Sequence, residues 1–196
     1  MKFSQNDEEL FILDYFKDSP PGRFLDIGAY TGKELSNTWE LAQRGWCGLC
    51  VEPSPDCFTS LMKNYEGNPR VTLLNACVGT NPGLIKFYNS GGAVATTNRE
   101  HYERWSQHQK DFREIYIPSI PFSSILREWP NDKYDFLSID TEGSDWDILV
   151  QIPLQALGVK MICIEYGSNF DAIGGYLKTH GFRLIHQNGE NVIYAI

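Results

Sequence analysis

Two glycines and two carboxylates stand where this chain is predicted to leave neighbouring strands. The run from Phe24 to Gly32 contains Asp26 and Gly28, and the next apolar run ends at Glu52. Glycine has no Cβ, so backbone N–H groups at such a turn can approach a ligand closely. A carboxylate at the end of the adjacent strand can accept hydrogen bonds from both hydroxyls of a ribose. The spacing therefore predicts a site for a cofactor that contains adenosine.

The residues around the glycines favour S-adenosylmethionine over a dinucleotide. The dinucleotide fingerprint G-x-G-x-x-G needs two more glycines, and Tyr30 and Lys33 stand in their places. Asp26 adds a negative charge that disfavours a diphosphate and suits an ammonium and a sulfonium. The alternatives are an ordinary strand–helix turn, an Asp26 that only caps a helix or bonds a turn, and a solvated Glu52.

Other residues are predicted to contact the cofactor because they flank these positions or end a neighbouring strand. The stretch 75–79 ends the third apolar run and is expected near the adenine, mainly through its backbone. The complete set of predicted cofactor contacts is Asp26, Gly28, Ala29, Tyr30, Gly32, Glu52, Pro53, Ala76, Cys77 and Asp140.

A second pair of carboxylates stands at the end of a later predicted strand. Asp140 and Glu142 are two residues apart and are expected to face one way, because alternate residues of a strand share a face. We predict that one of them is catalytic and orients or deprotonates an acceptor hydroxyl. The pair could instead hold a divalent metal or cap the helix expected to begin near Ser144. Glu165 ends the following strand at the same edge.

Cysteines and histidines show no metal-binding spacing, so no metal ligand is assigned. The five cysteines include one C-x-x-C pair, Cys47 and Cys50, whose members point to opposite faces of a strand. An odd number of cysteines in apolar segments predicts reduced, structural thiols. His101 and His108 fall in a variable segment and could line a substrate pocket, although surface positions are the simpler interpretation.

Alternation of apolar strands and helical patterns predicts an α/β fold with a mostly parallel sheet and helices on both faces. A C-terminal antiparallel hairpin completes the order of elements found in the Rossmann-like fold of class I methyltransferases. We expect one domain over residues 1–196, with 80–121 as a variable segment that faces the substrate. Among the local expectations are a helix over 33–43, a helix that begins at Pro55 with Ser54 as its cap, a strand over 71–78 with 84–88 beside it, a Ser144 cap, and a type I′ turn at Asn188-Gly189.

Charge and hydropathy limit the partners. The net charge is −8, the pI is about 5.0, and no basic cluster stands out. We therefore expect a small-molecule substrate, with no nucleic acid and no membrane partner. The polar N-terminal sequence shows no signal peptide and no apolar run spans a bilayer, which predicts a cytoplasmic protein.

Four segments together resemble the FkbM-type methyltransferases. They are Asp26–Gly32, Val51–Pro53, Ala76–Gly79 and Ile139–Leu149, and the resemblance covers about residues 22–166 in the same order. It implies S-adenosylmethionine as the methyl donor and, usually, O-methylation of a hydroxyl on a sugar or another small metabolite. Two departures, Ser138 in place of the usual lysine and Phe122-Ser123 in place of Leu-Asp, weaken any transfer of acceptor specificity.

The predicted function is therefore S-adenosylmethionine-dependent methyl transfer to a small-molecule hydroxyl acceptor. One alternative is a non-catalytic module that binds an adenosine cofactor and acts through a protein partner at the variable segment. A nicotinamide oxidoreductase is a third possibility and ranks below both.

Overall fold

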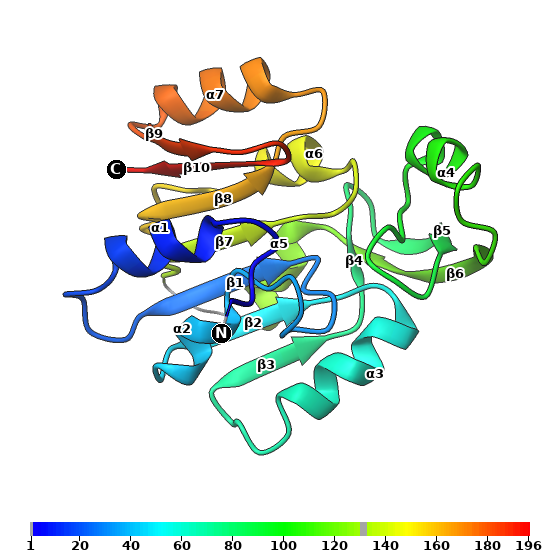
Figure 1. The fold of residues 1–196 in the computed structure, drawn as a ribbon, viewed down its shortest axis with the longest axis horizontal. Coiled ribbons are helices and arrows are strands. Elements are labelled where there is room, and N and C mark those ends of the chain that lie inside the picture. Colours follow the sequence, from blue (N-terminus) through cyan, green and yellow to red (C-terminus); the bar gives the residue numbers. More distant parts are fainter. Residues whose placement is uncertain (1, 130–132) are drawn as a thin grey trace.

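The computed structural model describes residues 2–129 and 133–196 and has a seven-stranded sheet at its centre (Figure 1). The strand order is β3-β2-β1-β7-β8-β10-β9, in which β10 runs antiparallel to both of its neighbours and the other pairings are parallel. This is the predicted arrangement, with the C-terminal hairpin at one edge. The strands are β1 (Arg23–Ile27), β2 (Cys47–Val51), β3 (Val71–Leu74), β7 (Phe136–Ile139), β8 (Met161–Glu165), β9 (Arg183–Gln187) and β10 (Asn191–Ala195).

Helices cover both faces of this sheet. The first face carries α1 (Glu8–Tyr15), α2 (Trp39–Gln43) and α3 (Pro55–Asn64). The second carries α5 (Phe122–Glu128), α6 (Asp145–Leu149) and α7 (Phe170–Thr179). The central strands are apolar because both of their faces are buried: Phe24 packs under the first group of helices, and Leu25 packs under the second.

A smaller sheet stands beyond the carboxyl ends of the parallel strands (Figure 1). It contains β4 (Cys77–Val78), β6 (Arg113–Ile120) and β5 (Gly83–Asn89), in that order. The helix α4 (Arg99–Trp105) lies between β5 and β6 in the chain and projects on the same side (Figure 1).

The smaller sheet corrects two expectations. The strand predicted over 71–78 is interrupted after Leu74, because Asn75 donates hydrogen bonds from its side chain to the carbonyl oxygens of Glu52 and Pro53. The chain then changes sheets. The segment 84–88 is a strand, but it pairs with β6 and not with β3.

The helix expected over 33–43 forms only at its end, over Trp39–Gln43. The preceding residues turn instead: Leu35 has φ 56° and is exposed, and the Ser36 N–H donates to the carbonyl of Phe3. The Ser36 hydroxyl in turn accepts from the N–H of Trp39. Short polar side chains that bond nearby backbone groups compete with helix formation, which explains the loss of the first turns.

The predicted type I′ turn is also wrong. That turn requires positive φ at both central residues, and neither Asn188 nor Gly189 has it. The Asn188 side-chain oxygen accepts from the N–H groups of Glu190 and Asn191, so a side-chain turn closes the hairpin.

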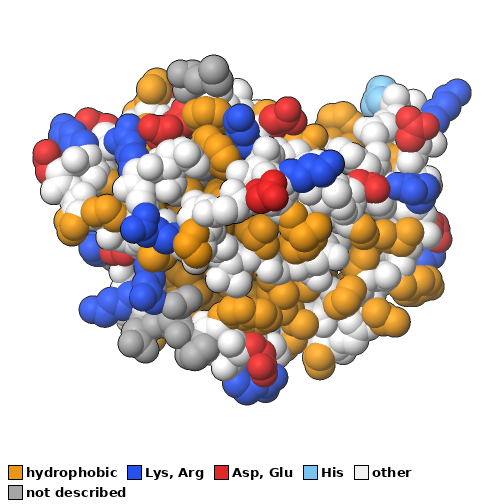
Figure 2. All heavy atoms as spheres, turned by 90° about the horizontal axis from the view of Figure 1, so that it is seen from below, with side chains coloured by type: hydrophobic (Ala, Val, Ile, Leu, Met, Phe, Trp, Pro, Cys, Tyr) orange, Lys and Arg blue, Asp and Glu red, His pale blue; other side chains and the backbone are white. Residues whose placement is uncertain are grey.

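No helix within 2–129 and 133–196 is long and apolar enough to cross a membrane. On the face shown in Figure 2, Lys and Arg side chains are interspersed with acidic and hydrophobic ones.

Candidate active site

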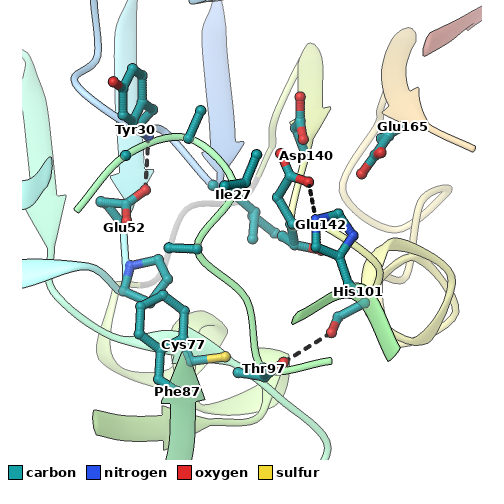
Figure 3. Close-up of a pocket in the computed structure, with 18 of the residues that line it drawn as sticks. Ile27, Tyr30, Glu52, Cys77, Phe87, Thr97, His101, Asp140, Glu142 and Glu165 are labelled. Carbon is teal, nitrogen blue, oxygen red and sulfur yellow. Dashed lines mark hydrogen bonds and ion pairs between the residues drawn. The ribbon is translucent and has the colours of Figure 1, made fainter. Parts of the chain in front are cut away.

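A cavity of about 500 Å³ opens at the carboxyl ends of β1, β2, β7 and β8. The other wall comes from the variable segment, which contributes Phe87, the stretch 92–95 and part of α4. Figure 3 shows Glu52 and Cys77 on one side, and Asp140, Glu142, Glu165 and His101 on the opposite side. The volume lies in the range of cofactor and small-molecule sites, about 300–1,000 Å³.

Most residues predicted to bind cofactor or to act in catalysis line this cavity. They are Gly28, Tyr30, Glu52, Pro53, Ala76, Cys77, Asp140 and Glu142.

The other three predicted cofactor residues lie behind the cavity wall. Asp26 is buried, and its carboxylate accepts a hydrogen bond from the Thr38 hydroxyl at 2.6 Å. Burial raises the pKa of Asp26 to about 6, against the effect of that bond. Ala29 packs in the core under the first group of helices. A Cβ on Gly32 would collide with the side chains of Leu61 and Tyr65, so this glycine serves packing.

Gly28 is required by the protein's own backbone. It has φ 87°, and a Cβ there would overlap the carbonyl oxygen of Asp140. Its N–H donates to the carbonyl of Val51. The glycine therefore allows the ends of β1, β2 and β7 to converge, and it also lines the cavity, where close approach of a ligand stays a prediction.

Glu52 lies directly beside the glycine turn. Its two carboxylate oxygens accept from the backbone N–H of Tyr30 at 2.8 Å and of Ser54 at 2.7 Å (Figure 3). Ser54 is also the predicted cap of α3, where its hydroxyl accepts from the N–H of Cys57. The Glu52 side chain is buried, and burial raises its pKa to about 8. The remaining lone pairs of this carboxylate are available to a ribose in the cavity.

The opposite side of the cavity concentrates negative charge. Burial and then the nearby Glu165 raise the pKa of Asp140 well above its ordinary value. Burial likewise raises the pKa of Glu165 to about 8, and one of its oxygens is buried with no hydrogen-bond partner. A cation brought into this side would relieve the repulsion between the acids.

The pair Asp140 and Glu142 shares the cavity, but not through strand alternation. β7 ends at Ile139, and Glu142 sits in the following turn with φ 57°. The turn is closed by Asp145, whose carboxylate accepts from the N–H groups of Thr141 and Gly143. Ser144 is the N-cap residue of α6, as expected, but its side chain accepts no capping hydrogen bond.

Backbone strain also gathers at the cavity. In the described chain, the non-glycine residues with positive φ are Tyr30, Leu35 and Glu142, and all three line the cavity. Such conformations cost about 1–3 kcal/mol each and cluster at functional sites, where the surrounding structure holds them in place.

His101 follows the pocket-lining interpretation that the sequence left open. The surface position favoured for it is wrong: only 6% of it is exposed, it lines the cavity, and its Nε2 lies 2.8 Å from Glu142 Oε2. His108 lines the cavity too. The nearest sequence signal was the position of both histidines in the variable segment.

Within the described residues, no three His, Cys, Asp or Glu side chains are arranged to hold a metal ion. Cys47 and Cys50 are free thiols, and burial raises the pKa of Cys50 well above its ordinary value.

Residues 26–184 match the methyltransferase FkbM domain. The chain belongs to this family. It is therefore a methyltransferase domain with S-adenosylmethionine as its methyl donor, and the interpretations as a non-catalytic module or a nicotinamide enzyme fall away. No curated protein matches the chain in sequence.

Solved methyltransferase structures share the fold. The SAH-bound *Podospora anserina* methyltransferase PaMTH1 has a TM-score of 0.56 and 11% identity over 98% of this chain and 79% of that chain. The METTL16 MTase domain has a TM-score of 0.53 and 15% identity over 95% of this chain, which spans only 65% of that structure. A ribosomal protein L11 methylase from *Lactobacillus delbrueckii* subsp. *bulgaricus* has a TM-score of 0.50 and 12% identity over 96% of this chain and 75% of that chain.

Proposed function

We propose that this methyltransferase methylates a hydroxyl oxygen of a sugar or another small metabolite. The observation that carries the proposal is the two-sided cavity: Glu52 stands beside the glycine turn on one side, and Asp140, Glu142 and Glu165 stand on the other. The first side suits the ribose of the donor, because a carboxylate can accept from both hydroxyls. The second suits its positively charged methionine end.

The donor supplies a methyl group activated by a positive sulfonium, so the protein mainly aligns an acceptor and excludes water. The variable segment supports a small acceptor, because Phe87, Thr97 and α4 form the wall of the cavity that faces the strand ends. An acceptor that reaches the donor has to fit under this wall. Asp140 and Glu142, predicted as catalytic, border that space.

Calorimetry with S-adenosylhomocysteine tests the donor site, and methyl-labelled S-adenosylmethionine with a panel of p-nitrophenyl glycosides tests the acceptor. The expected products are S-adenosylhomocysteine and a labelled methyl ether of the acceptor that survives alkali, whereas a carboxyl methyl ester is hydrolysed. Labelled ester or N-methyl product, or no transfer to any glycoside or free sugar alcohol, contradicts O-methylation of this substrate class.

A further inference from the structure

His101 is held on a rigid part of the cavity wall. Thr96 donates from its hydroxyl to the carbonyl of Glu142 at 2.8 Å, and Asn98 donates from its side chain to the carbonyl of Gly143 at 3.2 Å. Asn98 also caps α4, with its side-chain oxygen accepting from the N–H groups of Glu100 and His101. These bonds fix the start of α4 to the turn that follows β7.

The contacts of the imidazole define its tautomer. Arg104 Nη2 lies 3.1 Å from His101 Nδ1, and a guanidinium can only donate. Nδ1 is therefore the acceptor, and the ring proton sits on Nε2, which lies 2.8 Å from Glu142 Oε2 in an ion-pair contact that lacks hydrogen-bond geometry. A carboxylate next to one ring nitrogen, with a lone pair on the other, resembles the arrangement of a general base in a catalytic triad, and a small rotation of either side chain would complete the hydrogen bond.

We propose that His101 is the general base of the reaction, with Glu142 as its positioning residue. This rests on the proposed function. The acceptor hydroxyl takes the place of Arg104 at Nδ1, and Arg104 is free to leave because its side chain is exposed. His101, Glu142 and Asp140 lie together on the side of the cavity opposite Glu52 (Figure 3).

The neighbouring acids are less suited to this role. Burial and the other carboxylates raise the pKa of Asp140 well above its ordinary value, which disfavours the ionised form that a general base needs. The Glu142 carboxylate already lies against the imidazole. The negative charge of Glu142 stabilises the imidazolium that forms during the reaction.

The step balances without a further reactant. Nδ1 takes the hydroxyl proton while an oxygen lone pair forms the bond to the methyl carbon. The electron pair of the broken carbon–sulfur bond goes to sulfur, and the imidazolium later returns its proton to water.

Imidazole NMR tests the geometry without any acceptor. Long-range ¹H–¹⁵N spectra of the labelled protein should show His101 as the Nε2–H tautomer, with and without S-adenosylhomocysteine. Glu142→Ala should mix its tautomers. A predominant Nδ1–H tautomer, or spectra unchanged in Glu142→Ala, overturns the proposal.

Kinetics with the best panel acceptor test the role. His101→Gln should lower kcat roughly a hundredfold or more and leave the KM for S-adenosylmethionine within about twofold. Adding Glu142→Gln to His101→Gln should cost little more, because the two act as a unit.

The matched control is His186→Gln. It breaks another histidine–carboxylate contact of 2.8 Å, with Asp7, among residues that do not line the cavity, and should keep the wild-type rate. A His101→Gln variant that binds S-adenosylhomocysteine normally and turns over within threefold of wild type refutes the role of His101 alone. Failure of the wild type to bind S-adenosylhomocysteine refutes the proposed function instead.

Discussion

Glu52 should make the affinity for the adenosine part of the donor depend on pH. Burial raises its pKa to about 8 from an ordinary 4.5, so the empty protein holds this carboxyl largely protonated at pH 6. Ribose hydroxyls that donate to it favour the ionised form. Binding therefore releases a proton, and affinity rises with pH until the free carboxyl has ionised.

The size of the effect follows from that pKa. If the bound carboxyl stays ionised down to pH 6, with a pKa near 6, the dissociation constant falls by roughly 25-fold from pH 6 to 8, and by about 50-fold if its pKa lies well below 6. Glu52→Gln cannot ionise and loses a hydrogen bond to a charged acceptor, worth about 1.5–3 kcal/mol. The variant should therefore bind roughly 10- to 150-fold more weakly above pH 8 and approach the wild type at pH 6.

5′-Methylthioadenosine is the suitable ligand, because it keeps the adenosine and the sulfur but carries no charge that the acids opposite would sense. Calorimetry at pH 6, 7 and 8, in two buffers of different ionisation enthalpy, measures both the affinity and the released proton. The number of protons that the wild type releases on binding is measured without any variant. This test therefore remains valid even if a thermal melt shows that Glu52→Gln is poorly folded.

The matched control is Glu66→Gln, which changes an exposed glutamate that does not line the cavity and should reproduce the wild-type curve. A wild type whose affinity is flat between pH 6 and 8 refutes the reasoning. So does a Glu52→Gln variant that keeps the full wild-type slope.

Three further predictions concern stability. Gly28→Ala should lower the free energy of unfolding, measured in urea, by more than about 3 kcal/mol, because the added Cβ meets a backbone carbonyl. Gly67→Ala, at φ 78° in open space, should lower it by only about 1–2 kcal/mol. Equal losses in the two variants would contradict this. Thr38→Val should lower the free energy of unfolding by about 1–3 kcal/mol, because the buried Asp26 loses the hydrogen bond of 2.6 Å that the Thr38 hydroxyl donates. An unchanged urea midpoint would show that this bond contributes nothing. The melting temperature of the ligand-free protein should fall as pH rises from 5 to 8. The pKa of Glu52 is about 8 in the folded protein and 4.5 ordinarily, so its protonated form stabilises the fold fully below pH 4.5, and this stabilisation is lost as pH rises through about 8. A calorimetric melting temperature that rises over this range would contradict the sign.

Local patterns were sufficient for the central sheet. Apolar runs separated by helical spacing predicted β1, β2, β7 and β8 and the C-terminal hairpin, because strands buried on both faces are continuously apolar. The Ser54-Pro55 pair predicted the start of α3 by its capping chemistry alone.

Expectations failed where a distant contact outweighed the local pattern. Asn75 interrupts a run that reads as one strand by bonding to the chain after β2. The helical spacing of 33–43 yields to short polar side chains that bond backbone groups around Ser36. The hydrogen-bond partners of Asn75 and Ser36 cannot be identified from the periodicity of the segments that contain them.

The family, the donor and the edge of the sheet where Glu52 meets the glycine turn can all be read from the sequence, because they depend on short motifs at strand ends. Which groups face one another across the cavity follows from the folded chain alone. His101 reaches Glu142 from a helix 41 residues earlier in the chain. Gly28 is explained by a carbonyl that follows β7. Both depend on where the fold brings distant segments together, and residue spacing along a chain carries no such distance.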